Sequence, residues 1–228
     1  MDRVTADSTA DLRATTSKTT PPAGPDSLRG GGDDRLLALG LSTLFFLVVA
    51  VFWVVKPVKR GLLLSHHEAP LELVGWALEA AQVEQVAKVV NMFAALVAVA
   101  VFTRLVRALD RRRLLVVLCA GFAVVFAAFG VLVPSPSSSV VWGLYVFGDV
   151  YATLMVGTFW ALTSDVMRSG QAERSYGLIG LGGVLGGFVG ATVVRGWVES
   201  SGRDSLLFGC AALLVVVAML AVWGESRT

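Results

Sequence analysis

Long uncharged apolar stretches restrict this chain more than any other feature of its sequence. Leu36–Val55, Leu114–Val133, Ser175–Val194 and Ser205–Gly224 contain no Asp, Glu, Lys or Arg. A helix needs about 20 apolar residues to cross the ~30 Å core of a bilayer, and only a helix or a closed barrel satisfies its own backbone polar groups there. These four stretches therefore predict four membrane-spanning helices.

Two further segments have nearly the same character. The uncharged stretch Val89–Thr103 is too short to span by itself, so a helix there must include the preceding turn, which contains Lys88. Val140–Ser164 is long enough but contains Asp149. With both included, the sequence predicts an all-α, polytopic membrane protein with a six-helix transmembrane domain over residues 35–226. The expected helices cover about residues 36–56, 86–106, 114–134, 140–164, 175–195 and 205–224.

The composition agrees with a bilayer as the main surroundings of this chain. Of its residues, 55% are hydrophobic and only 16% are charged, compared with roughly 25% charged residues in a soluble domain. The net charge of +2 and the lack of basic stretches interleaved with aromatic residues predict no nucleic-acid partner. Cys119 and Cys210 each fall inside an apolar stretch, which indicates buried or lipid-facing thiols rather than a disulfide framework.

The segments around the second predicted helix and before the first are polar. Residues 1–34 are rich in Ser, Thr, Pro, Gly and Asp, which predicts a disordered tail. Pro70–Gln85 carries Leu71, Val74 and Leu78 at helical spacing among glutamates. We expect this segment to extend the second helix or to lie along the membrane surface.

Basic residues in short loops set the expected orientation, because they are retained on the cytoplasmic side. The loop between the second and third helices has one acid, Asp110, and five arginines: Arg104, Arg107, Arg111, Arg112 and Arg113. The next loop, Pro134–Ser139, is uncharged and is expected outside, and Arg168 and Arg174 then return to the cytoplasm. Both termini are therefore expected to lie in the cytoplasm, with the chain in the inner or plasma membrane.

Five charged residues are candidates for binding a solute. Lys56, Lys59 and Arg60 follow the first helix on the expected outer side, where they would attract anions or anchor to lipid headgroups. Asp149 lies about ten residues into the fourth helix, where a carboxylate is costly unless it is paired or hydrated. A shorter fourth helix would instead leave it near the headgroups. Lys88 is a weaker candidate, because a lysine can extend its amine outward.

Glycines and charged pairs are candidates for packing or gating. In the fifth helix the pairs Gly182/Gly186, Gly183/Gly187 and Gly186/Gly190 are each four residues apart, so another helix can approach closely. That contact would be static packing or a sliding contact. At the cytoplasmic ends, Asp110 among the loop arginines, Arg111 included, and Asp165 near Arg168 and Arg174 would form interhelical charge clusters that hold one transport state, or would be solvated loop charges.

Enzymatic chemistry is not indicated. The sequence has no recognisable nucleophile with a base, no pair of catalytic carboxylates and no phosphate-binding loop, and His66-His67-Glu68 is its only metal-like cluster. Adjacent loop histidines are usually solvated, so we expect no metal and no cofactor.

Three stretches resemble major facilitator transporters, in particular the bacterial relatives of the ATP/ADP translocases. Phe52–Arg60 is similar to that family's aromatic segment followed by basic residues and Pro-Val, with Arg60 where the family has an acid. Phe159–Asp165, followed by Ala172–Gly180 and the glycine-rich helix, looks like the family's most recognisable region. Arg104–Arg113 is similar to the basic loop of major facilitators generally.

The resemblance implies that the chain is the N-terminal half of a transporter with two six-helix halves. It would work by alternating access on a small anionic solute, such as a nucleotide in ATP/ADP-type exchange, together with a second half or a second copy of itself. Lys56, Lys59 and Lys88 would attract the anion, and Asp149 would pair with a cation. The alternative is a non-transporting scaffold or regulatory subunit, or a truncated carrier fragment.

Overall fold

The computed structural model describes residues 26–66, 71–73, 76–78, 80–167 and 169–225. Its contacts divide the chain into two units, Met1–Leu36 and Leu37–Thr228, and the described part of the first unit is the beginning of a helix. The elements, in order, are α1 (Asp26–His66), β1 (Leu71–Leu73), β2 (Trp76–Leu78), α2 (Ala80–Ala108), α3 (Arg111–Leu132), α4 (Ser138–Val166) and α5 (Ser169–Glu225).

Six helical segments of the described chain are long and apolar enough to cross a membrane. Four of them are the apolar parts of α1 to α4, and α5 supplies two, because it breaks at Gly202 (φ 81°, ψ 170°). We call Ser175–Val198 the first arm of α5 and Gly202–Val222 its second arm. The prediction of an all-α membrane protein with six spanning helices is thus confirmed at the level of helix number and length.

Helix α1 is longer than the sequence indicated at both ends. It begins at Asp26, inside the segment expected to be a tail, while residues 1–25 lie outside the described residues. It ends at His66, about ten residues beyond the expected end, and Pro57 lies inside it. The reason for the longer end is that Leu62 and Leu63 are buried in the bundle, which favours helix past the proline. Consequently Lys56, Lys59 and Arg60 lie within a helix rather than after it.

The segment before α2 differs from the expected helical extension. β1 pairs with β2 in antiparallel register, with Leu71 opposite Leu78, and helix resumes only at Ala80. In so short a segment, apolar residues at helical spacing do not distinguish a helix from two short strands. The helical interpretation of Pro70–Gln85 therefore holds only from Ala80 onward.

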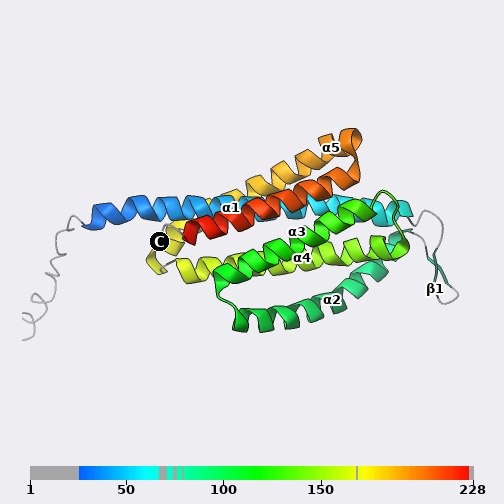
Figure 1. Ribbon diagram of the computed structural model, residues 1–228, viewed down its shortest axis with the longest axis horizontal. Helices are drawn as coiled ribbons and strands as arrows, with labels where there is room; N and C mark the ends of the chain where they lie inside the picture. Colours follow the sequence, from blue (N-terminus) through cyan, green and yellow to red (C-terminus); the bar gives the residue numbers. More distant parts are fainter. Residues whose placement is uncertain (1–25, 67–70, 74–75, 79, 168, 226–228) are drawn as a thin grey trace, which may run out of the picture. The chain divides into compact units, whose positions relative to one another are not determined.

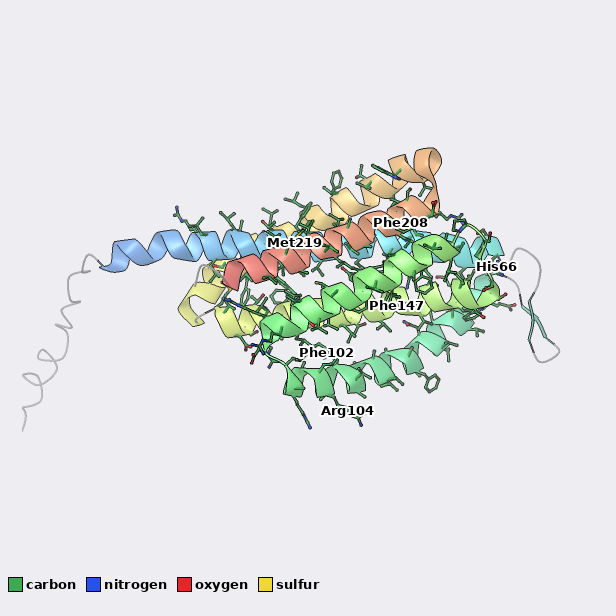
Figure 2. All side chains as sticks on the ribbon, viewed as in Figure 1. His66, Phe102, Arg104, Phe147, Phe208 and Met219 are labelled. Atoms are coloured by element: carbon green, nitrogen blue, oxygen red, sulfur yellow. The ribbon has the colours of Figure 1, made fainter. Side chains whose placement is uncertain are left out.

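Helix α4 has α1, α2 and α3 packed against it (Figure 1). The buried Tyr151 hydroxyl on α4 donates a hydrogen bond to the Val48 carbonyl of α1 (3.0 Å), and the Phe45 and Phe159 rings stack at 4.4 Å. Aromatic rings also join α4 to α3, where Phe147 lies 5.2 Å from Phe122 (Figure 2).

Further contacts complete the bundle. α3 lies along α5, and an added Cβ at Gly130 of α3 would be 3.0 Å from the Phe208 ring of the second arm. α2 is the most exposed of the six spans: it packs against α4, but most of its large apolar side chains, among them Phe93, Leu96 and Val97, are exposed. These side chains are free to contact lipid or another protein.

Two ends of the bundle can be distinguished. At one, Arg203 donates to the Ser65 hydroxyl (3.1 Å) and His66 lies 3.1 Å from the Ser138 hydroxyl, so α1 ends where α4 and the second arm begin. We call this the His66 end. At the other, the Arg111 end, α2 and α4 end and α3 begins, with Arg111 paired to Asp165.

Candidate functional site

An ion pair between α1 and α4 is the main polar feature inside the bundle. Lys59 of α1 forms a salt bridge with Asp149 of α4, and the Lys59 side chain is only 6% exposed, compared with 31% for Asp149. The Lys59 amine also donates to the Tyr145 carbonyl (3.2 Å) and lies 4.4 Å from the centroid of the Tyr145 ring. Three groups of α4 therefore surround one cation of α1.

The local sequence explains why Lys59 points into the bundle. Val55 and Val58, one turn and one residue earlier in α1, are buried, so the face that carries Lys59 packs against α4. On α4, Gly148 provides the space, because an added Cβ there would lie 3.0 Å from Lys59 Cδ and 3.0 Å from Val55 Cγ1. A larger residue at position 148 would push the lysine stem away from Asp149.

The pair lies some way along both helices from the His66 end. Lys59 precedes His66 by seven residues and Asp149 follows Ser138 by eleven, so at 1.5 Å per residue the two are roughly 10 Å and 16 Å from the His66 end. Within the hydrocarbon core of a membrane a single charge is costly, and charges found there are paired and usually functional. The sequence analysis singled out both residues, but it did not pair them with each other.

A second group of charges joins α1 to α2. Arg60 contacts one carboxylate oxygen of Glu84 (3.0 Å), and Lys88 lies 3.4 Å from the other. The Glu84 side chain is 14% exposed, whereas Arg60 and Lys88 are 61% and 55% exposed. The sequence analysis missed Glu84 as a site residue, although its i,i+4 spacing to Lys88 on an apolar helix was a usable signal.

Lys56 stands apart from both groups. Its amine lies 4.9 Å from the Trp53 ring and 5.6 Å from the Phe52 ring, and its side chain is exposed. The five predicted binding residues therefore separate into one buried pair, two cations that share Glu84, and one cation over aromatic rings. With Glu84 included, the region has four cations and two carboxylates and is net positive.

The predicted cytoplasmic charge clusters are only partly joined. Arg111 donates to Asp165 across α3 and α4 (3.0 Å), which is a link the sequence analysis did not make. Asp110 contacts Arg113 of its own segment at 3.9 Å, and both side chains are exposed. The side chain of Arg174 lies outside the described residues.

The glycine stripe of the first arm faces α1. Added Cβ atoms at these glycines would collide with α1 backbone carbonyls, in the order Gly182 with Ser42, Gly186 with Phe46, and Gly190 with Ala50. The neighbouring stripe meets side chains, Gly183 the Phe45 ring and Gly187 the Trp53 indole nitrogen (2.9 Å). The Ser42 hydroxyl also donates to the Leu178 carbonyl (2.9 Å). The two helices thus approach backbone to backbone.

Of the metal-like cluster His66-His67-Glu68, only His66 is among the described residues, and it lies beside Ser138.

No protein-family model, curated protein or solved structure matches this chain. Its function must therefore be argued from its own residues, of which the Lys59–Asp149 pair is the most informative.

Proposed function

We propose that this chain is one six-helix half of a membrane carrier of the major facilitator type, which moves a small anionic solute by alternating access. The observation that carries the proposal is the Lys59–Asp149 pair between the candidate spanning segments of α1 and α4, in which Lys59 is buried and Asp149 half-buried. Ionisable residues within spanning segments face a bundle interior or a pathway and mark routes for solutes or ions. Under this proposal the chain is a carrier and not an enzyme.

The pattern of helix contacts supports two related groups of three spans, as in transporters built from inverted repeats. The first group is α1, α2 and α3, and the second is α4 with the first and second arms of α5, in that order. α2 packs on α4, and the first arm packs on α1, so each second member contacts the first member of the other group. α1 also packs on α4, and α3 packs on the second arm, so the first members contact each other and the third members contact each other. α1 ends at the His66 end where α4 begins, so the two groups run in opposite directions.

A partner half is part of the proposal, because one half does not enclose a pathway. α2 has a face available for such a partner, because its side chains Phe93, Leu96 and Val97 are exposed. The partner is either a second six-helix half or a second copy of this chain.

The solute would be recognised by competition with the chain's own carboxylate. Lys59 already has an anionic partner in Asp149, and Arg60 and Lys88 share Glu84. An arriving carboxylate or phosphate would take the place of Asp149 beside Lys59 and draw on the exposed Arg60 and Lys88. Two cationic centres suit a solute with several negative charges, and a nucleotide exchanged for another nucleotide is the solute we place first.

Uptake into proteoliposomes tests the proposal. The chain, with and without its partner half, would be reconstituted with Lys59→Gln, Asp149→Asn or the control Arg195→Gln, and uptake of labelled nucleotides and other organic anions measured. Arg195 is an exposed cation on the first arm of α5, near the His66 end of the bundle. We expect Lys59→Gln and Asp149→Asn to change uptake at least tenfold and Arg195→Gln to leave it unchanged. Equal uptake by all variants would remove the pair from the pathway.

A second candidate is a non-transporting scaffold or regulatory subunit, or a fragment of a carrier, and the exposed apolar face of α2 also suits a docking subunit. Cross-linking in membranes separates the candidates. A subunit of this kind would bind its partner without any anion uptake.

A further inference from the structure

A cleft of about 550 Å³ opens at the Arg111 end, between the end of α2, the start of α3 and the end of α4. Four arginines line it: Arg107, Arg111, Arg112 and Arg113. Its walls also include the apolar side chains of Leu109 and Leu162. A cationic cleft with apolar walls suits a ligand that is anionic at one end and apolar at the other.

The positive charge of the cleft is only partly neutralised by the chain. Arg111 is held by Asp165 at 3.0 Å, and Arg113 faces Asp110 at 3.9 Å with both side chains more than 70% exposed. Within the part of the chain that the structure describes, neither Arg107 nor Arg112 has an ion-pair or hydrogen-bond partner. These two arginines leave a surplus of positive charge at the cleft.

The cleft lies where three candidate spanning segments end, which is where a headgroup layer is expected. The α2 span ends at Ala108, the α3 span begins at Arg111 and the α4 span ends at Val166. α3 is 22 residues long, and its N-cap residue Asp110 makes no side-chain hydrogen bond to the first turn. The backbone N–H groups of that turn and the helix dipole therefore add to the attraction for an anion.

We propose that this cleft binds the phosphate diester of an anionic phospholipid headgroup. Arg107 and Arg112 contact the phosphate oxygens, since a guanidinium matches phosphate geometry, and the apolar walls receive the start of an acyl chain. A free phosphate solute shares the first part of this chemistry but not the second. Basic pockets between spanning helices are general sites for such headgroups, and the inference does not depend on transport.

The test is native mass spectrometry of the detergent-solubilised full chain, titrated with phosphatidylglycerol or with phosphatidylcholine. The variant Arg107→Gln/Arg112→Gln is compared with Arg104→Gln, which removes an arginine that does not line the cleft and points away from the bundle (Figure 2). We expect a preference for phosphatidylglycerol in the wild type and in Arg104→Gln. In the double variant that affinity should fall by about fivefold for each arginine removed.

Two further measurements keep the outcome clear. The double variant Arg107→Lys/Arg112→Lys retains the charge and should retain most of the preference, which guards against loss through misfolding. Equal loss in Arg104→Gln and Arg107→Gln/Arg112→Gln would mean a diffuse charge effect and would overturn the proposal. Displacement of the lipid by an equal concentration of glycerol 3-phosphate would assign the cleft to a soluble phosphate and would overturn the lipid assignment.

Discussion

Lys59 keeps its ammonium inside a membrane-spanning helix because α4 supplies a carboxylate, a backbone carbonyl and an aromatic face for it. Each contact offsets part of the cost of removing the charge from water. Losing one partner of such a pair is worse than losing both charges, because the remaining charge stays buried without compensation.

We predict that Asp149→Asn lowers the free energy of unfolding by about 2 kcal/mol, somewhat less than the 3–5 kcal/mol typical of fully buried pairs. The effect is smaller because the Asp149 side chain is 31% exposed. The double variant Lys59→Met/Asp149→Leu should regain most of this loss. Denaturant unfolding in micelles, followed by tryptophan fluorescence, measures both. A double variant at least as unstable as the two single variants added together would contradict the expectation.

The sequence identified Asp149 as a costly residue of α4 and Lys59 as one of three basic residues after the first predicted helix, but it did not identify them as partners. Their pairing depends on how α1 is rotated and on the space left by Gly148, which are properties of packing between helices 90 residues apart in the chain. Glu84 escaped notice for a similar reason, since its role comes from Arg60 on another helix.

At the scale of the elements, the first arm of α5 and α1 meet through their backbones. Glycines spaced by four oppose α1 residues that are also spaced by four, so both helices keep the contact over more than two turns. Close approach of this kind is stabilised by van der Waals packing and by weak Cα–H···O contacts.

We predict that Gly186→Ala destabilises the protein by about 1–3 kcal/mol, because the added methyl group overpacks against the Phe46 carbonyl. The matched control is Gly180→Ala on the same arm, where an added Cβ meets nothing within 4 Å. That change should be neutral or stabilising by up to about 1 kcal/mol, since alanine favours helix over glycine. Thermal unfolding in one detergent compares them, and equal midpoints would show that the stripe does not carry the contact.

The break in α5 leads to a second prediction at this scale. Gly202 has φ 81° and ψ 170°, a conformation that is nearly restricted to glycine. Gly202→Ala should lower the free energy of unfolding by about 1–3 kcal/mol and should shift the second arm against α3. The control Gly209→Ala should do neither, because an added Cβ there meets nothing within 4 Å. Unfolding midpoints and protease sensitivity near residue 202 are the measurements. An unaffected Gly202→Ala would mean that the turn tolerates another backbone conformation.

The elements themselves were largely predictable, because hydrocarbon requires long apolar helices whatever they pack against. Their ends were harder to predict. α1 continues through Pro57 to His66 because Leu62 and Leu63 are buried by the bundle. Leu71–Leu73 and Trp76–Leu78 form strands where the spacing favoured a helix. Tertiary contacts decided both cases, and a sequence pattern does not contain them.

For the whole molecule, an even number of crossings brings the two ends of the chain to one side. We predict that tags at residue 1 and at residue 228 are both protected in sealed right-side-out vesicles and both digested by protease in inside-out vesicles. The five arginines near the Arg111 end favour the cytoplasm for that side. Opposite protection of the two tags would mean that one of the six segments does not cross.

The Lys59–Asp149 pair also has an electrical consequence for the proposed carrier. With no solute present, the positive and negative groups cancel, so a reorienting bundle moves no net charge of this pair through the membrane field. A bound univalent anion adds one negative charge, on which the field does work of about 2.3 kcal/mol for each 100 mV that the charge crosses. As far as this pair is concerned, a membrane voltage would therefore act on the bundle with the anion bound and not on the bundle without it.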